Sequence, residues 1–67
     1  MDSDPLLAFF DYGHLPEKLQ VVSKQFAALA QEIIQLCDPG EERHVAMRKL
    51  LESKDAAVRA RLTTKVL

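Results

Sequence analysis

The side chains that could carry out chemistry are few in this chain, and their spacing argues against catalysis. His14 and His44 lie thirty residues apart, and no serine or cysteine stands in a recognisable nucleophile motif. Two histidines and the single cysteine, Cys37, match no familiar zinc-site spacing. Glu41 and Glu42 suit the first turn of a helix better than an acid–base pair. We therefore expect no enzyme activity, no catalytic residue, no bound metal and no cofactor.

Residues that could bind a ligand stand in the first third of the chain. Tyr12 is the only tyrosine, and it lies beside Gly13 and His14 in a turn-forming run. A tyrosine can stack on a nucleobase while its hydroxyl contacts a phosphate. On the local sequence alone, a tyrosine that closes one end of a helical hairpin is the simpler interpretation. Lys18 and Lys24 follow, and they suit either phosphate pairing or a solvated helix face.

The second half of the chain is rich in basic residues. They are Arg48, Lys49, Lys54, Arg59 and Arg61. They fit either a solvated surface or cationic pockets at junctions between subunits. The whole chain has a net charge of −1, with 9 Lys and Arg against 10 Asp and Glu. No global attraction to DNA, RNA or an anionic membrane follows from that balance.

The elements that would position these residues are organised around one short junction. Asp38 is a good N-cap, Pro39 suits the first helical position, and Glu41 stands where a capping-box side chain reaches back to the cap. One helix must therefore end just before the junction and the next begin at once. A connection this short forces the two helices to lie antiparallel. We predict helices over residues 16–37 and 39–63.

Helical periodicity is strictest in the first of these two helices, where apolar residues recur at alternating steps of three and four. They are Leu19, Val22, Phe26, Leu29, Ile33 and Leu36. A second stripe widens the apolar face and consists of Ala27, Ala30, Ile34 and Cys37. We therefore expect more than one neighbouring helix, and a buried, unreactive cysteine. The last helix carries a stripe of Ala46, Met47, Leu50, Leu51, Ala57, Val58 and Leu62, interrupted by Lys54.

A short helix is predicted ahead of the hairpin. Asp4 before Pro5 is a cap signal for a helix over residues 5–10, which carries Leu6, Leu7, Phe9 and Phe10. A helix of one or two turns is not stable alone, so these side chains must pack on the hairpin or on another subunit. The 67 residues are thus predicted to form one all-α domain over residues 1–67. It is a short N-terminal helix followed by a long antiparallel αα-hairpin, and it assembles into a homo-oligomer because so few helices cover only part of the apolar faces.

The compartment is suggested by what the sequence lacks. One cysteine permits no internal disulfide, and no signal peptide pattern is present, so we expect a reducing compartment. No apolar run approaches the roughly 20 residues of a membrane span.

One run spans the junction and the residues after it, namely Cys37-Asp38-Pro39-Gly40-Glu41-Glu42-Arg43-His44-Val45-Ala46-Met47-Arg48-Lys49-Leu50. It resembles the hairpin signature of the phage anti-CBASS sponge family, the family of anti-CBASS protein 2. A related hairpin occurs in a phage anti-Thoeris protein. Two further elements are similar to family elements, namely Ala56-Ala57-Val58-Arg59 and Tyr12-Gly13-His14-Leu15-Pro16. The resemblance covers about residues 9–62, and it departs at Ser53-Lys54-Asp55, where the family usually carries a tryptophan.

This resemblance implies a compact helical oligomer, a hexamer in the best-known members. It binds cyclic dinucleotides, and in some members cyclic trinucleotides, without cleaving them. Such a sponge works in the cytoplasm of the infected bacterial host, where it starves a cyclic-oligonucleotide defence of its signal. The implied dinucleotide pocket uses Tyr12 and Lys24, with Lys18 as the alternative lysine, next to Gly13 and His14. The implied trinucleotide site uses Arg61, or else Arg59.

Two other functions compete with this one. The chain could be a small helical adaptor whose apolar stripes occupy the helix groove of a host or phage protein. It could also bind nucleic acid, which the charge balance disfavours.

Overall fold

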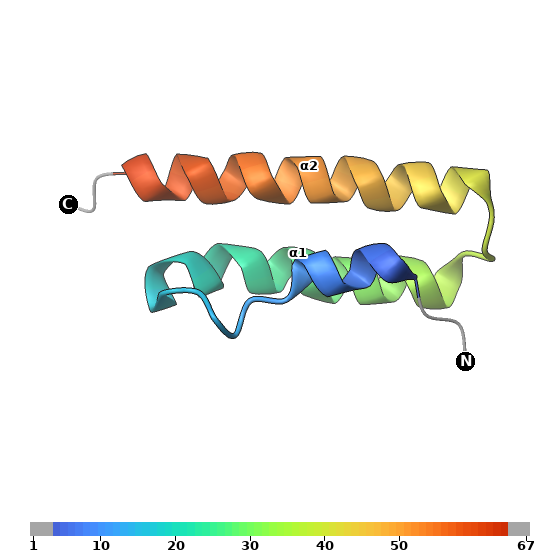
Figure 1. The fold of residues 1–67 in the computed structure, drawn as a ribbon, viewed down its shortest axis with the longest axis horizontal. Coiled ribbons are helices and arrows are strands. Elements are labelled where there is room, and N and C mark those ends of the chain that lie inside the picture. Colours follow the sequence, from blue (N-terminus) through green and yellow to red (C-terminus); the bar gives the residue numbers. More distant parts are fainter. Residues whose placement is uncertain (1–3, 65–67) are drawn as a thin grey trace.

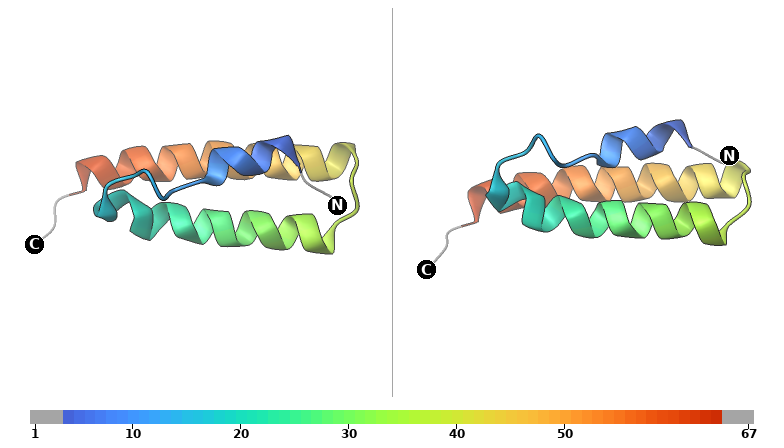
Figure 2. Two further views of the ribbon diagram at one scale, coloured as in Figure 1. Left: turned by 60° about the horizontal axis from the view of Figure 1, so that its bottom comes forward. Right: turned by 90° about the horizontal axis from the view of Figure 1, so that it is seen from below.

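The computed structural model describes residues 4–64. In order, the elements are the 3-10 helix η1 (Pro5–Phe10), helix α1 (Glu17–Leu36) and helix α2 (Glu41–Thr63). The two α-helices lie antiparallel, and η1 runs along the same face of both (Figures 1 and 2). The predicted all-α hairpin with a short leading helix is confirmed for the described residues.

Helix η1 has the predicted bounds but the tighter 3-10 geometry. Asp4 caps it, because one of its carboxylate oxygens accepts a hydrogen bond of 2.9 Å from the backbone N–H of Leu6. Phe10 is the residue that anchors it, with only 2% of its surface exposed. Phe9, in contrast, is 61% exposed, so of the two places expected for these side chains, the hairpin or another subunit, it does not occupy the first.

The centre of the core takes one residue from each element. Phe10 of η1, Ala30 of α1 and Met47 of α2 are buried against one another. Partly buried side chains surround this cluster, and they are Leu6, Leu7, Phe26, Ala27, Ile33, Ile34, Leu50 and Leu51. The seam predicted from steps of three and four therefore supplies part of the core. Its outer members Leu29 and Leu36 remain 45% and 83% exposed.

The junction between α1 and α2 differs from the prediction. The N-cap of α2 is Gly40, not Asp38, and no side chain caps the helix, so the expected capping box is wrong. Four residues, 37–40, separate the helices, a length within the usual range for an αα-hairpin. Glu41 and Glu42 do lie in the first turn of α2, as expected.

Cys37 is exposed, which corrects the expectation that it is buried. It is the C-cap of α1 and has extended backbone dihedrals, with φ −119° and ψ 134°. A residue that has left the helical conformation no longer follows the stripe of the helix, so its side chain turns away from the core.

Arg43 closes the same end of the hairpin from the α2 side. It is only 7% exposed, and its guanidinium donates hydrogen bonds to the backbone carbonyls of Cys37 at 3.1 Å and Ile34 at 3.5 Å. The last turn of α1 contains no basic residue. The cation that a helix C-terminus favours is therefore supplied across the junction by the neighbouring helix.

The apolar stripe of α2 is shorter than predicted. Met47 is fully buried and Leu50 and Leu51 are half-buried, but Ala46 and Leu62 are exposed. Lys54 lies on this stripe with only 13% of its side chain exposed, and its ammonium pairs with the Asp55 carboxylate at 3.1 Å. The lysine thus buries its stem and places its charge beside a neighbouring anion.

Candidate functional site

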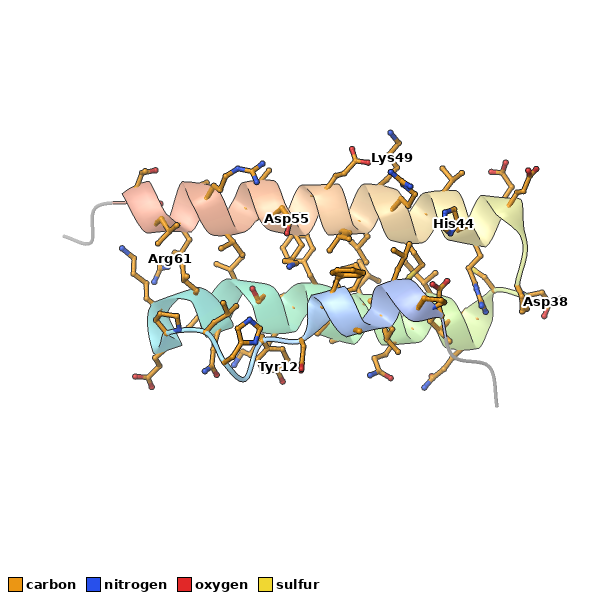
Figure 3. All side chains as sticks on the ribbon, viewed as in Figure 1. Tyr12, Asp38, His44, Lys49, Asp55 and Arg61 are labelled. Atoms are coloured by element: carbon orange, nitrogen blue, oxygen red, sulfur yellow. The ribbon has the colours of Figure 1, made fainter. Side chains whose placement is uncertain are left out.

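A hollow of about 380 Å³ lies between η1 and α1. It is lined by Asp4, Leu7, Ala8, Phe10, Asp11, Tyr12, Ala27 and Gln31. Tyr12 is half-buried in its wall, where the chain leaves η1 and runs beside α1 (Figure 3). The volume falls in the range of small-molecule pockets, and an aromatic side chain beside apolar walls suits a flat, planar group.

The turn after η1 fixes the position of Tyr12. The carbonyl of Tyr12 accepts a hydrogen bond of 3.0 Å from the backbone N–H of Leu15. The side-chain amide of Gln20 then donates to the carbonyls of Leu15 at 2.8 Å and Gly13 at 3.4 Å. The first turns of α1 therefore hold the turn in place, while Gly13 and His14 remain exposed on its outer side.

Lys24 lies on the side of α1 that faces this turn and the hollow. Gln20 contacts the turn, and Ala27 and Gln31 line the hollow. Lys24 follows Gln20 by four residues and precedes Ala27 by three and Gln31 by seven, and residues at these spacings share one side of a helix. At about 1.5 Å of rise per residue, its Cα is roughly 4.5 Å along the axis from that of Ala27. Lys24 is exposed and is not a lining residue. The fold thus places Tyr12 in the wall of the hollow and Lys24 outside the lining, on the same side of α1 as Ala27 and Gln31.

Lys18, the alternative lysine, lies at the end of the hairpin where α1 begins and α2 ends, and it contacts the α2 side. Its ammonium donates to the carbonyl of Thr64 at 3.4 Å, and its own carbonyl accepts a hydrogen bond of 3.3 Å from Nε of Arg61. Figure 3 shows Arg61 pointing from α2 toward the start of α1. The two residues that the sequence assigned to different sites therefore lie together, where α1 begins and α2 ends.

Arg59 does not join that pair. Successive residues of an α-helix turn by about 100°, so Arg59 points to a different side of α2 from Arg61. Arg59 is exposed, whereas Arg61 is half-buried against α1. Of the two arginines considered for a second site, only Arg61 contacts another element.

Apart from Tyr12, the polar side chains that line the hollow are not the ones singled out from the sequence. They are the carboxylates of Asp4 and Asp11 and the amide of Gln31, and no lysine, arginine or histidine lines it. In the sequence, Asp4 has the features of a helix cap and Asp11 those of a turn residue. The signal that could have found Gln31 is its spacing from Gln20, Lys24 and Ala27, which places all four on one side of the helix.

Neither a metal centre nor a membrane span is found in the described part of the chain. No group of three or more His, Cys, Asp or Glu side chains in residues 4–64 lies close enough together to hold a metal ion. Within the same residues, neither long helix is apolar enough to cross a bilayer.

Comparison of the sequence with family models, with curated proteins and with solved structures finds no match. Function is therefore inferred from the geometry of the hollow and from the sequence resemblance described above.

Proposed function

We propose that this protein binds cyclic dinucleotides and sequesters them without cleaving them. The observation that carries the proposal is the half-buried Tyr12 in the wall of a 380 Å³ hollow, with Lys24 on the adjoining ridge of α1. A nucleobase is flat and apolar on its faces, and a phosphate needs a cation nearby, so these two groups match one half of the ligand. The resemblance to the phage anti-CBASS sponge family supports the same assignment, with Tyr12 and Lys24 in the expected roles.

The acidic lining decides which part of the ligand enters. Asp4 and Asp11 would repel a phosphate inside the hollow, whereas an uncharged base meets no such repulsion. The base therefore occupies the hollow against Tyr12, and the phosphate stays outside it, within reach of Lys24. Gly13 and His14 lie on the exposed turn that follows Tyr12.

A cyclic dinucleotide has two similar halves, and one chain supplies one hollow of this kind. A second copy related by a two-fold axis would supply the matching base site and cation. The surface of the chain supports such assembly. Large apolar side chains remain exposed on it, among them Phe9 at 61%, Leu29 at 45% and Leu36 at 83%.

The finer features of the proposal come from the family resemblance. They are a hexameric assembly, a bacterial cytoplasmic setting during phage infection, and loss of signal to a CBASS-type defence. A second site for cyclic trinucleotides would use Arg61, whose contact with α1 places its guanidinium at the end of the hairpin. Arg59 is the weaker candidate for that site because it points elsewhere on α2.

The test is titration calorimetry of the purified protein with a panel of cyclic di- and trinucleotides, followed by heat release of the ligand and chromatography. We expect sub-micromolar binding and recovery of intact ligand. Tyr12→Ala should weaken binding by roughly fivefold to a hundredfold, since stacking of a base on an aromatic side chain contributes about 1–3 kcal/mol. Degraded ligand would reveal an enzyme, and the absence of heat with every ligand from a folded oligomer would refute the proposal.

Matched lysine variants locate the cation. Lys24→Gln should weaken binding, whereas Lys49→Gln removes an equally exposed lysine on the far helix and should leave it unchanged. Lys18→Gln tests the alternative lysine, and we expect no loss of dinucleotide affinity because the Lys18 ammonium donates to the carbonyl of Thr64, just after the end of α2. The mass of the oligomer is measured for each variant, so that loss of assembly is not mistaken for loss of ligand contacts.

A helical adaptor is the competing function, and one surface feature favours it. Phe26, Leu29 and Gln25 line a shallow depression of about 190 Å³ on α1, away from the residues that line the larger hollow. An apolar depression on a helix face suits either a second copy of the chain or a partner helix. If Tyr12→Ala destroys the oligomer and no nucleotide binds, the tyrosine is structural and the adaptor becomes the better proposal.

A further inference from the structure

The carboxylate of Asp11 is the charged group in the hollow that is most open to a ligand. Asp4 already accepts a hydrogen bond from Leu6 at 2.9 Å as the cap of η1. Asp11 uses its backbone N–H, which donates to the carbonyl of Ala8 at 3.3 Å. Its carboxylate forms no hydrogen bond or ion pair with the other residues that the structure describes. It lines the hollow next to Tyr12, the residue on which the base would stack.

A carboxylate accepts hydrogen bonds and donates none, so it discriminates between bases by their edges. The Watson–Crick edge of guanine presents two adjacent donors, N1–H and N2–H, which match the two oxygens of a carboxylate. Adenine presents one donor beside an acceptor, which matches an amide instead. Uracil presents one donor flanked by two carbonyl oxygens, and these would face the negative charge.

We propose that the hollow selects guanine, and that Asp11 determines this specificity by accepting both donors of the guanine edge. This inference deepens the proposed function and rests on it. The hollow already bears the negative charge of two aspartates and no lining cation, which favours a base edge made of donors over one made of acceptors. Gln31, on the α1 side of the hollow, has an amide that can pair with the remaining polar atoms of the purine.

The experiment compares the Kd values of cyclic di-GMP and cyclic di-AMP for the full-length protein and for Asp11→Asn. A good bidentate pair distinguishes the right base from the wrong one by roughly tenfold to a hundredfold. We expect the wild type to favour cyclic di-GMP by that factor. Asparagine offers one donor and one acceptor, so the variant should lose the preference or reverse it toward cyclic di-AMP. Asp38→Asn makes the same change on an exposed carboxylate in the hairpin loop and should leave the ratio unchanged.

A second measurement needs no variant. Cyclic di-IMP lacks the 2-amino group of guanine and keeps N1–H, so the wild type should bind it more weakly than cyclic di-GMP. Equal affinity for cyclic di-GMP, cyclic di-IMP and cyclic di-AMP would overturn the specificity assigned to Asp11 while leaving the sponge in place. If no cyclic dinucleotide binds the folded oligomer, the proposed function itself fails. A ratio that survives Asp11→Asn, in a variant of unchanged helicity and mass, would also overturn the role of Asp11.

Discussion

Replacing Arg43 by methionine tests how the hairpin is closed. The guanidinium donates at 3.1 Å to the carbonyl of Cys37, and the 3.5 Å contact to Ile34 is too long to add much. A buried hydrogen bond from a charged donor contributes about 1.5–3 kcal/mol, and a cation at a helix C-terminus about 0.3–1 kcal/mol. Methionine keeps an unbranched apolar stem of similar reach, so the loss should be mainly polar. We expect Arg43→Met to lower the free energy of unfolding by about 2–3 kcal/mol.

That loss would be large for a chain of this size. At about 0.05–0.15 kcal/mol per residue, 67 residues have a total stability of roughly 3–10 kcal/mol. The Tm should therefore fall by on the order of 10–20 °C, at about 4–8 °C per kcal/mol for a domain this small. The assay is urea unfolding and thermal melting followed by circular dichroism, at one fixed protein concentration because assembly would couple to stability.

The control is Arg48→Met, which removes an exposed arginine from the same helix and should change stability by less than about 0.5 kcal/mol. An Arg43→Met variant as stable as the wild type, or more stable, would refute the stabilising role of the guanidinium. In that case the free-energy cost of removing the guanidinium from water would equal or exceed the stabilisation by its hydrogen bonds.

Three further substitutions test other parts of the fold. Ser23 is 1% exposed, and its hydroxyl has no hydrogen-bond partner in the described structure. Ser23→Ala should therefore raise the free energy of unfolding, measured by urea titration, by about 1 kcal/mol. A lower free energy of unfolding would mean that the hydroxyl is hydrogen-bonded. Gly40 has extended dihedrals, and a methyl group added there would meet nothing within 4 Å. Gly40→Ala should therefore stabilise the fold by about 0.4–1 kcal/mol through reduced entropy of the unfolded chain, and a lower Tm would contradict the extended cap. Leu29→Glu places a charge on the exposed seam of α1. Light scattering should show a smaller oligomer, while circular dichroism shows unchanged helicity. An unchanged mass would exclude this face from the assembly.

Much of the fold follows from local signals in the sequence. Asp4 and Pro5 predict the start of the short helix, and the steps of three and four along α1 predict its length to within one residue at each end. These features depend on neighbours in the sequence, such as a cap or a helical face, and so they are readable without the third dimension.

The errors arise where local signals compete with chain geometry. Asp38 has every feature of a helix cap, yet Gly40 takes that place and the connection extends over residues 37–40. Cys37 fits the apolar stripe by its number, but the helix ends one residue earlier and its side chain is exposed. The spacing of apolar residues along the chain does not show at which residue the helix ends.

The candidate site was predictable only in part. Tyr12 and Lys24 could be named because their chemistry is distinctive, whereas Asp11 and Gln31 are ordinary residues that become informative only when they line the same hollow. Lys18 and Arg61 are separated by most of the chain, and only the antiparallel packing of α1 and α2 brings them together. Contacts of this kind depend on the register between helices, which no single segment encodes.

The attachment of η1 divides the molecule into two units of different stability. Phe10 is its one fully buried anchor, whereas α1 and α2 pack along their whole length, so residues 4–15 should detach at a lower free energy than the hairpin unfolds. The hollow between η1 and α1 exists only while η1 is packed on the hairpin. A ligand that contacts Tyr12 would therefore bind only the molecules in which η1 is packed on the hairpin. Its apparent affinity would be lowered by the fraction of molecules in which η1 is detached. If ligand slows amide hydrogen exchange in η1 and leaves exchange in the middle of α2 unchanged, the ligand stabilises the packed position of η1.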